Sequence, residues 1–196
     1  QNPFTGLQNH EPEIDRGALL AQQRARVDEL RQAKYENILE GNDSIELLNG
    51  SASFKDSRTV VVTLPDGSEK TLAPDYVLIA TGSSPAVPPV PGLADVPFWD
   101  STKALFAETI PGHLIVIGSS VVAVEIAQAY RRLGAEVTVL ARTRLLSQED
   151  PALGEGLTAA FEREGIRVLA ATSASQVTYE DRRFNVTIEG GELTAD

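Results

Sequence analysis

Cysteine and methionine are both absent from this chain of 196 residues. The absence of cysteine excludes disulfide bridges, thiolate metal ligands and a cysteine nucleophile within the sequence. Methionine is missing even from the first position, which is Gln1, and the last residue, Asp196, follows closely on a Gly-Gly turn. We therefore expect an internal segment of a longer protein, with a processed mature protein as the alternative.

Positive charge and long apolar runs are also scarce. The 17 basic residues, only four of them lysines, face 28 acidic ones, which gives a formal net charge of −11. Such a balance repels the phosphate backbone of nucleic acids, so we expect no nucleic-acid partner. No apolar run approaches the ~20 residues that a membrane-spanning helix needs, so we expect no membrane association. With 42% hydrophobic residues, the chain can form a folded core.

The most informative part of the sequence is a strand–turn–helix–strand pattern. Residues 114–117 and 137–140 are apolar runs typical of buried strands, and a helical pattern occupies 121–133 between them. Gly118 follows the first run and Gly134 ends the helix. This order predicts half of a dinucleotide-binding fold. An ordinary β-α-β crossover without a ligand is the alternative.

The turn before this helix resembles the dinucleotide motif G-x-G-x-x-G/A. Gly118 and Ala123 occupy its first and third places, where a tight turn and close helix–strand packing are needed. Ser120 occupies the second place, normally glycine, and its hydroxyl could donate to a phosphate. We therefore expect the turn to accept a pyrophosphate.

The residues after the second strand predict the choice of nucleotide. An NAD site usually carries an acid there, which binds the ribose 2′-hydroxyl. Here the position is Ala141, followed by Arg142 and Arg144. Guanidinium groups without an acid favour a 2′-phosphate, so the sequence predicts NADPH over NADH.

Other elements flank this unit. A long amphipathic helix is predicted from Asp15 to about Leu39, and a proline-rich link is predicted at 85–92. Strands are predicted at 45–48, 52–54, 59–64, 69–72, 76–80 and 166–169, with a closing hairpin of 175–179 and 185–189. Further helices are predicted at 102–106, capped by Ser101, and from Asp150-Pro151 to about Glu164.

Three segments together resemble the pyridine nucleotide–disulfide oxidoreductases. These segments are Thr71 with Ala80-Thr81-Gly82-x-x-Pro85, the nucleotide turn with Glu125, and the stretch from Asp150 to Ile166. The resemblance implies FAD and NADPH as cofactors, with hydride passing from NADPH to flavin and then to a cysteine pair. Within the family the sequence is most similar to members that reduce Hg(II) to Hg(0), which implies Hg(II) as the substrate of the parent protein. The resemblance also implies a homodimer and a cytoplasmic location.

The resemblance assigns roles to particular residues. It implies FAD contacts at Ala52, Thr81 and Gly82. It implies NADPH contacts at Gly118, Ser119, Ser120, Val121 and Val122, with Glu125 near the nicotinamide and Arg142 and Arg144 at the 2′-phosphate. It implies neither a catalytic residue nor a metal ligand in this chain, because the redox cysteines are missing. Two positions depart from relatives: Val121 stands where some have an aromatic gate, and Gln148 where a second phosphate-binding arginine is common.

The predicted fold class is α/β, with a partial FAD-binding lobe and a nearly complete doubly wound NAD(P)-binding lobe. We expect residues 1–100 to form the first lobe and residues 101–196 the second, truncated before its last strand. Two alternatives remain open. One is a dihydrolipoamide dehydrogenase-like flavoprotein, which the Ala141-Arg142 pair disfavours, and the other is a non-catalytic nucleotide-binding module.

Overall fold

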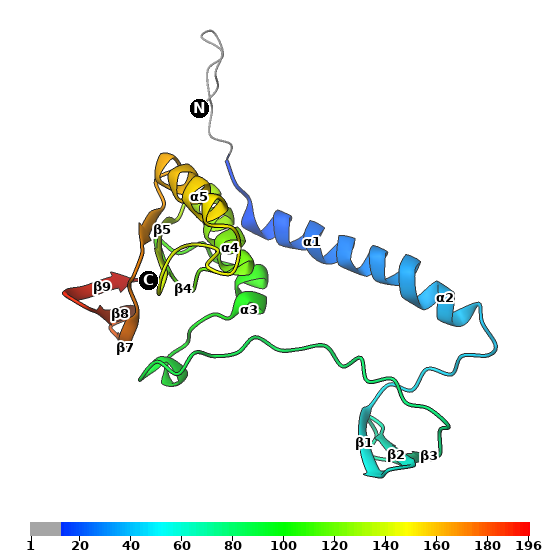
Figure 1. The fold of residues 1–196 in the computed structure, drawn as a ribbon. Helices are drawn as coiled ribbons and strands as arrows, with labels where there is room; N and C mark the ends of the chain where they lie inside the picture. The colour runs from blue at the N-terminus through cyan, green and yellow to red at the C-terminus, as the bar shows by residue number, and fades with distance from the viewer. Residues whose placement is uncertain (1–12) are drawn as a thin grey trace. The chain divides into compact units, whose positions relative to one another are not determined.

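The computed structural model describes residues 13–196. Contacts divide the chain into two compact units (Figure 1). The smaller unit is Ala21–Ser84, and the larger unit consists of Pro85–Asp196 with the residues up to Leu20. The two units are described separately below.

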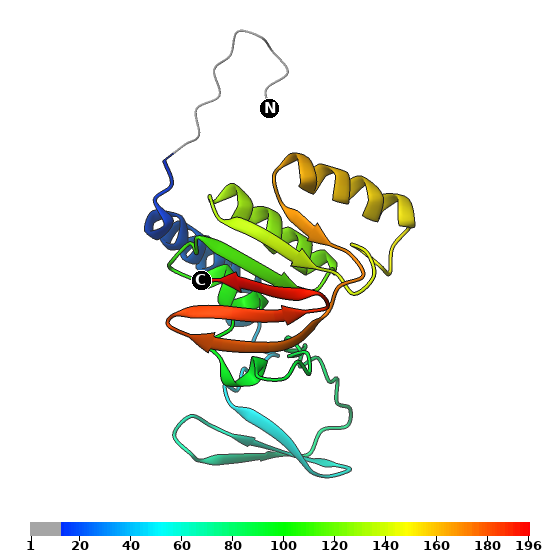
Figure 2. The same ribbon diagram turned by 90° about the vertical axis from the view of Figure 1, so that its left-hand side faces the viewer.

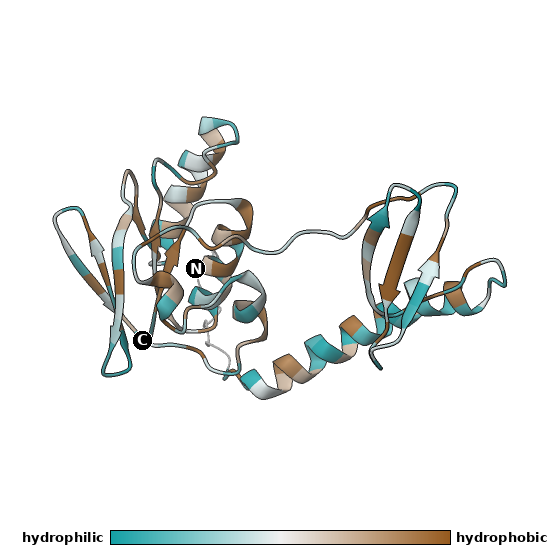
Figure 3. Cartoon of the chain, turned by 90° about the horizontal axis from the view of Figure 1, so that it is seen from below, coloured by the Kyte–Doolittle hydropathy of each residue, from teal (hydrophilic) through white to brown (hydrophobic). Residues whose placement is uncertain are grey.

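The first helix begins where the sequence predicts. Helix α1 (Arg16–Arg31) follows Asp15, whose Oδ1 accepts the Ala18 backbone N–H at 2.9 Å. This is the N-cap bond that satisfies one of the free amides of a helix start. The helix continues through a π-helical turn η1 (Gln32–Glu36) into α2 (Asn37–Glu40), which ends at Gly41. Hydrophilic and hydrophobic residues alternate along α1 (Figure 3).

The smaller unit contains a three-stranded antiparallel sheet in the order β1-β2-β3. The strands are β1 (Ser51–Asp56), β2 (Thr59–Thr63) and β3 (Glu69–Leu72). The central strand β2 has the sequence Thr-Val-Val-Val-Thr and is the most hydrophobic of the three (Figure 3). A turn joins β2 to β3: the Gly67 N–H donates to Leu64 O at 2.9 Å, and Gly67 has a φ of 82°.

Two predicted strands of the smaller unit do not form. Residues 45–48 and 76–80 have no strand conformation, although both are apolar runs. Within residues 13–196 no strand pairs with either run, and Tyr76 and Leu78 are 94% and 90% exposed. Apolar composition alone does not make a strand, because the backbone groups also need a ladder partner.

A parallel sheet forms the centre of the larger unit. Its strands β4 (His113–Ile117), β5 (Glu136–Leu140) and β6 (Arg167–Leu169) lie in the order β4-β5-β6. Helices α4 (Val121–Arg132) and α5 (Pro151–Arg163) connect them in sequence. The β-α-β pattern predicted from the sequence is therefore confirmed.

Side chains alternate between the two faces of the sheet. Val137 and Val139 of β5 pack in one core with Val124 and Ala127 of α4 and Phe161 of α5. Leu140, by contrast, packs in a second core. The alternation follows from the two-residue period of a strand and leaves the sheet covered on both faces.

The second face carries strands rather than helices. Strands β7 (Ala174–Glu180), β8 (Arg183–Ile188) and β9 (Gly191–Ala195) form an antiparallel sheet (Figure 2). Val177 and Val186 of this sheet pack against Leu140 and against Leu93 of the 3₁₀ turn η2 (Leu93–Asp95). The parallel sheet is therefore covered by helices on one face and by an antiparallel sheet on the other, a mixed α/β arrangement. The predicted hairpin of β7 and β8 is confirmed, whereas β9 was not predicted.

Caps fix the remaining helices. Helix α3 (Ser101–Phe106) is capped by Asp100, whose Oδ1 accepts the Lys103 N–H at 2.7 Å, and not by Ser101 as predicted. Asp150 caps α5 through the Ala152 N–H at 2.9 Å, with Pro151 at the first helical position. The α5 cap agrees with the Asp-Pro start predicted from the sequence. Across residues 13–196, the helices are each too short or too polar to cross a bilayer.

Candidate nucleotide site

The glycine turn connects the end of β4 to the start of α4. Gly118 has a φ of 136°, a backbone conformation that L-residues rarely adopt. Its N–H donates to Leu140 O at 3.0 Å, so the turn lies against the end of β5. The first place of the motif is thus glycine because the backbone requires it, as the sequence predicts.

The start of α4 leaves hydrogen-bond donors available. Ser120 is the N-cap, with extended backbone at φ −72° and ψ 170°, and its side chain forms no capping bond. Val121 and Val122 are about half exposed. The first amides of a helix have no partner within the helix and carry a partial positive charge. An exposed helix start of this kind favours a phosphate.

The end of β5 brings the predicted selectivity residues beside the turn. Ile117 is paired with Leu140 in the parallel ladder, so Gly118 and Ala141 follow their strands at the same edge of the sheet. Ala141 is fully buried, whereas Arg142 is exposed. Among the described residues, Arg142 forms no hydrogen bond or ion pair. Its guanidinium is therefore available to an anion at the carboxyl edge of the sheet.

Arg144 is used differently from its neighbour. Its guanidinium donates to four backbone carbonyls of the residues that follow it. The acceptors are the oxygens of Leu145 at 3.3 Å, Leu146 at 2.9 Å, Ser147 at 3.3 Å and Glu149 at 2.8 Å. Both terminal nitrogens of Arg144 thus donate to the backbone of the loop. The predicted contact between Arg144 and a 2′-phosphate stays a prediction.

The remaining predicted residues lie at different places in the fold. Glu125 is exposed on α4, one turn from the glycine turn. Ala52 pairs with Val62 in the small sheet, and Thr81 and Gly82 belong to the same unit. All three predicted FAD contacts are exposed, and Gly82 has a φ of 70° with open space around its Cα.

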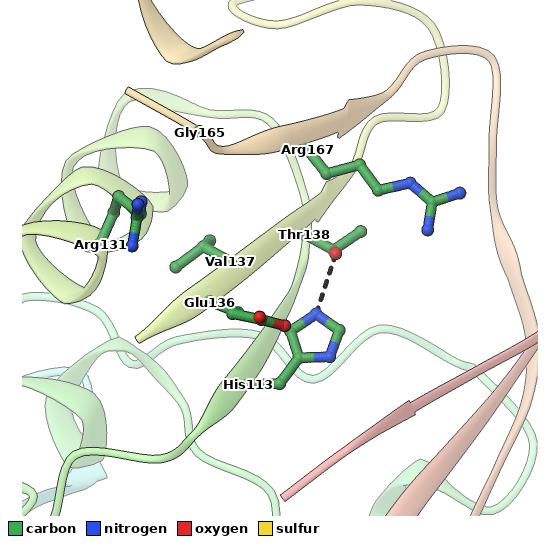
Figure 4. Close-up of a pocket in the computed structure, with 7 residues that line it drawn as sticks. All are labelled: His113, Arg131, Glu136, Val137, Thr138, Gly165 and Arg167. Carbon is green, nitrogen blue, oxygen red and sulfur yellow. Dashed lines mark hydrogen bonds between the residues drawn. The ribbon is translucent and has the colours of Figure 1, made fainter. Parts of the chain in front are cut away.

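A hollow of about 320 Å³ lies at the opposite edge of the parallel sheet from the glycine turn (Figure 4). Its lining residues are His113, Arg131, Glu136, Val137, Thr138, Gly165 and Arg167. His113, Glu136 and Arg167 are the first residues of β4, β5 and β6, so the hollow lies at the amino ends of the strands, whereas nucleotides bind beyond the carboxyl ends. The hollow is therefore not the nucleotide site.

The His113 ring joins three strands beside this hollow. Its Nδ1 lies 2.9 Å from Thr194 O of β9, and its Nε2 lies 2.9 Å from Thr138 Oγ1 of β5. Because a carbonyl only accepts, Nδ1 carries the proton that faces Thr194. The Arg131 and Arg167 side chains lie on opposite sides of this pair (Figure 4). His113 thus has a structural role, tying β9 to the parallel sheet.

Sequence reasoning missed the residue that links the two halves of the candidate site. Leu146 donates its N–H to Ser119 O at 2.8 Å, which connects the loop after β5 to the glycine turn. Leu146 also has a φ of 50°, unusual for a residue that is not glycine. Leucine does not favour a positive φ, so the sequence gives no indication of this conformation.

The chain is similar in sequence to curated proteins from several bacteria. The chain is 57% identical over 195 residues to a mercuric reductase of Shewanella putrefaciens. It is 60% identical over 201 residues to a mercuric reductase of Shigella flexneri and 59% identical over 197 residues to one of Acidithiobacillus ferrooxidans. These alignments cover 100% of this chain but only 35–36% of the relatives.

Solved structures show the same fold. The HOCl-induced flavoprotein disulfide reductase RclA of Escherichia coli superposes with a TM-score of 0.81 at 24% identity, covering 91% of this chain and 40% of that one. The family model described as pyridine nucleotide-disulphide oxidoreductase matches residues 5–196. The glycine turn, the parallel sheet and this match over nearly the whole sequence lead to one conclusion: the chain belongs to the pyridine nucleotide-disulphide oxidoreductase family.

Proposed function

We propose that the whole protein is an FAD- and NADPH-dependent oxidoreductase that reduces Hg(II) to Hg(0). The observation that carries this proposal is identity of 57–60% to proteins named mercuric reductase over the full length of the chain. Since the chain spans about a third of those relatives, the activity belongs to the proposal and not to these 196 residues alone.

The residues at the carboxyl edge of the larger unit fit NADPH. Gly118 allows the tight turn from β4 into α4, and the start of α4 offers its first amides and the Ser120 hydroxyl to a pyrophosphate. Arg142 is exposed and unpaired among the described residues, and no acid follows β5 to bind a ribose 2′-hydroxyl. In this proposal Gly118, Ser119, Ser120, Val121 and Val122 hold the pyrophosphate and nicotinamide ribose, with Glu125 toward the nicotinamide.

The FAD assignment rests on family membership. Ala52, Thr81 and Gly82 are all exposed and belong to the smaller unit. When bound, NADPH supplies the hydride and FAD transmits its electrons. The division into an FAD lobe of residues 1–100 and an NADPH lobe of residues 101–196 is part of the same proposal.

The chemistry of the substrate places a requirement on the rest of the protein. Hg(II) is a soft ion that prefers thiolate ligands. The 196 residues contain no cysteine, so they supply neither a thiolate ligand nor a dithiol reductant. This part of the enzyme therefore contributes nucleotide binding and orientation. A homodimer and a cytoplasmic location complete the proposal.

The test is Hg(II)-dependent oxidation of NADPH by the purified protein, followed at 340 nm, with release of elemental mercury measured in parallel. We expect NADPH consumption to require Hg(II) and to match the mercury released. NADH in place of NADPH serves as the matched cofactor control and should support a lower rate. A flavoprotein that oxidises NADPH with a dithiol substrate but not with Hg(II) would contradict the proposed substrate.

A further inference from the structure

Arg144 is the most heavily hydrogen-bonded side chain at the nucleotide edge. Its two terminal nitrogens each donate to two carbonyls within residues 145–149, which we call the clamp loop. A planar guanidinium with donors in a fixed fork can serve several carbonyls at once, which a lysine ammonium on a flexible stem does less well. Arg144 therefore fixes the backbone of the clamp loop from within.

The clamp loop needs such support because its backbone is strained. Leu146 has a φ of 50°, in the left-handed region that a branched side chain rarely occupies. Leu145 is 1% exposed and belongs to the core between the parallel sheet and helices α4 and α5, and Leu146 packs against that core. The core thus holds the two leucine side chains while Arg144 holds their carbonyls.

The first turn of α5 closes against the same loop. A side chain at Gly154 would overlap Leu145 O and come within 3.0 Å of Arg144 Nη1. Gly154 is buried, and its lack of a side chain lets helix, loop and guanidinium pack together. The Arg144 guanidinium therefore lies between the first turns of α5 and the loop carbonyls.

The clamp loop in turn supports the glycine turn. The Leu146 N–H donates to Ser119 O at 2.8 Å, next to Gly118 and Ser120. Through this bond, the position of the clamp loop determines the position of the carbonyl in the middle of the turn. Arg142, by contrast, is exposed, forms no hydrogen bond or ion pair with a described residue, and is free to meet a ligand.

We propose that the two arginines have separate roles: Arg142 alone binds the 2′-phosphate, and Arg144 is a positioning residue that holds the clamp loop against the glycine turn. This proposal rests on the proposed NADPH site. It replaces the symmetrical expectation, in which both guanidinium groups bind phosphate. It also predicts that Arg144 affects NADPH and NADH equally, because the pyrophosphate turn is common to both nucleotides.

The test compares Arg142→Ala, Arg144→Ala and Arg144→Lys in the purified protein. Dissociation constants for NADPH and NADH are measured by calorimetric titration, and hydrogen exchange of a peptide covering residues 143–149 reports the clamp loop. For Arg142→Ala we expect about 10- to 100-fold weaker NADPH binding, the range for one charge-assisted bond, with NADH binding and loop protection unchanged. For Arg144→Ala we expect both nucleotides to weaken by the same factor and exchange at 143–149 to accelerate.

Arg144→Lys and Arg163→Ala sharpen the comparison. Lysine keeps the positive charge but cannot donate to four carbonyls at once, so Arg144→Lys should accelerate hydrogen exchange of the clamp loop about as much as Arg144→Ala does. Arg163 is exposed at the end of α5 and lies outside the loop, so Arg163→Ala controls for loss of one positive charge. Its nucleotide affinities and loop exchange should match those of the unchanged protein.

The opposite pattern would overturn the proposal. If Arg144→Ala weakened NADPH selectively, while Arg144→Lys restored it and loop exchange stayed slow, Arg144 would be a phosphate ligand. If the unchanged protein bound neither nucleotide, the proposed NADPH site would fail and the role of Arg142 with it. The exchange measurement would still decide whether Arg144 holds the clamp loop.

Discussion

At the scale of single residues, the backbone of Gly118 limits what the nucleotide turn tolerates. Its φ of 136° strains any L-residue, although an added Cβ would meet only Ala123 Cβ at an ordinary 3.8 Å. We expect Gly118→Ala to lower the free energy of unfolding by about 1–3 kcal/mol, the usual range for such strain. NADPH affinity should fall as well, because the strained turn shifts away from the phosphate position. Urea unfolding and calorimetric titration measure the two effects.

Substitutions at two other glycines test whether the loss of stability and the loss of NADPH affinity have the same cause. Gly134 has a φ of 105° with open space around it, far along the chain from the turn, so Gly134→Ala should lose stability but keep NADPH affinity. Gly156 lies inside α5 with nothing within 4 Å, so Gly156→Ala should raise stability by about 0.5–1 kcal/mol. Equal behaviour of Gly118→Ala and Gly156→Ala would contradict the strain at the turn.

The pair of His113 and Thr138 predicts a second effect at this scale. Thr138 is 3% exposed, and its hydroxyl is the partner of His113 Nε2 at 2.9 Å. Thr138→Val keeps the shape but leaves that nitrogen without its partner, which should lower the free energy of unfolding by about 1–3 kcal/mol. Thr187→Val on β8, where the hydroxyl has no partner among the described residues, is the control for the same change. A loss no greater than that of the control in urea unfolding would argue against the bond.

Residue types revealed some roles and not others. The absence of an acid after β5 and the presence of Arg142 could be seen in the sequence, because they follow from strand order and charge. The difference between Arg142 and Arg144 could not, since both are arginines two positions apart. It depends on a positive φ at Leu146 and on the buried Gly154, which only the folded backbone reveals.

At the scale of elements, Glu164 connects the end of α5 to α4. Its carboxylate accepts from Arg132 Nη2 at 3.0 Å and Nε at 3.2 Å, and from Gln128 Nε2 at 2.8 Å. The hydrogen bonds from Arg132, foremost, hold the pKa of Glu164 below its ordinary value of 4.5. A lowered pKa means that the folded state favours the ionised form. Its contribution to stability is therefore present above pH 4.5 and is lost as pH falls through the lowered pKa.

We accordingly expect Glu164→Gln to destabilise the protein at pH 7 by about 0.2–1 kcal/mol, as for exposed ion pairs. The difference from the unchanged protein should shrink as the pH falls below 4.5. Urea unfolding between pH 3 and pH 7 measures it, and Glu162→Gln, on an exposed position of the same helix, is the control. A difference that stays constant over this pH range would show that the carboxylate charge has no part in the effect.

The elements themselves were largely predictable where one local rule decides them. Caps and breakers gave the start of α1 at Asp15, the start of α5 at Asp150-Pro151 and the end of α4 before Gly134. The strand predictions at 45–48 and 76–80 were wrong, because a strand needs a pairing partner elsewhere in the chain, which the local sequence does not specify. β9 was missed because its sequence, Gly-Glu-Leu-Thr-Ala, has little apolar character and is held by contacts with β8 and with His113.

At the scale of the whole molecule, the two compact units differ in how well their apolar side chains are buried. In Pro85–Asp196 the parallel sheet has helices on one face and the β7-β8-β9 sheet on the other, so its core is closed on both sides. In Ala21–Ser84 large apolar side chains such as Tyr35, Ile38 and Leu78 are mostly exposed. The larger unit therefore has the packing that a preorganised binding site requires, while the smaller one does not.

This contrast predicts where bound NADPH protects the molecule. A ligand that binds only the folded state stabilises the part that holds it, by about 2.7 kcal/mol at 100 times its dissociation constant. We expect hydrogen exchange to slow in peptides covering the glycine turn, the start of α4 and residues 142–149. Peptides from β1–β3 should keep their exchange rates, because those strands form a separate compact unit. Arg142→Ala at the same NADPH concentration is the control: with binding about 10- to 100-fold weaker, it should reduce the protection to about 0.4–1.4 kcal/mol. Protection that spread to β1–β3, and that Arg142→Ala left intact, would mean that the nucleotide binds elsewhere than at the edge formed by Gly118 and Arg142.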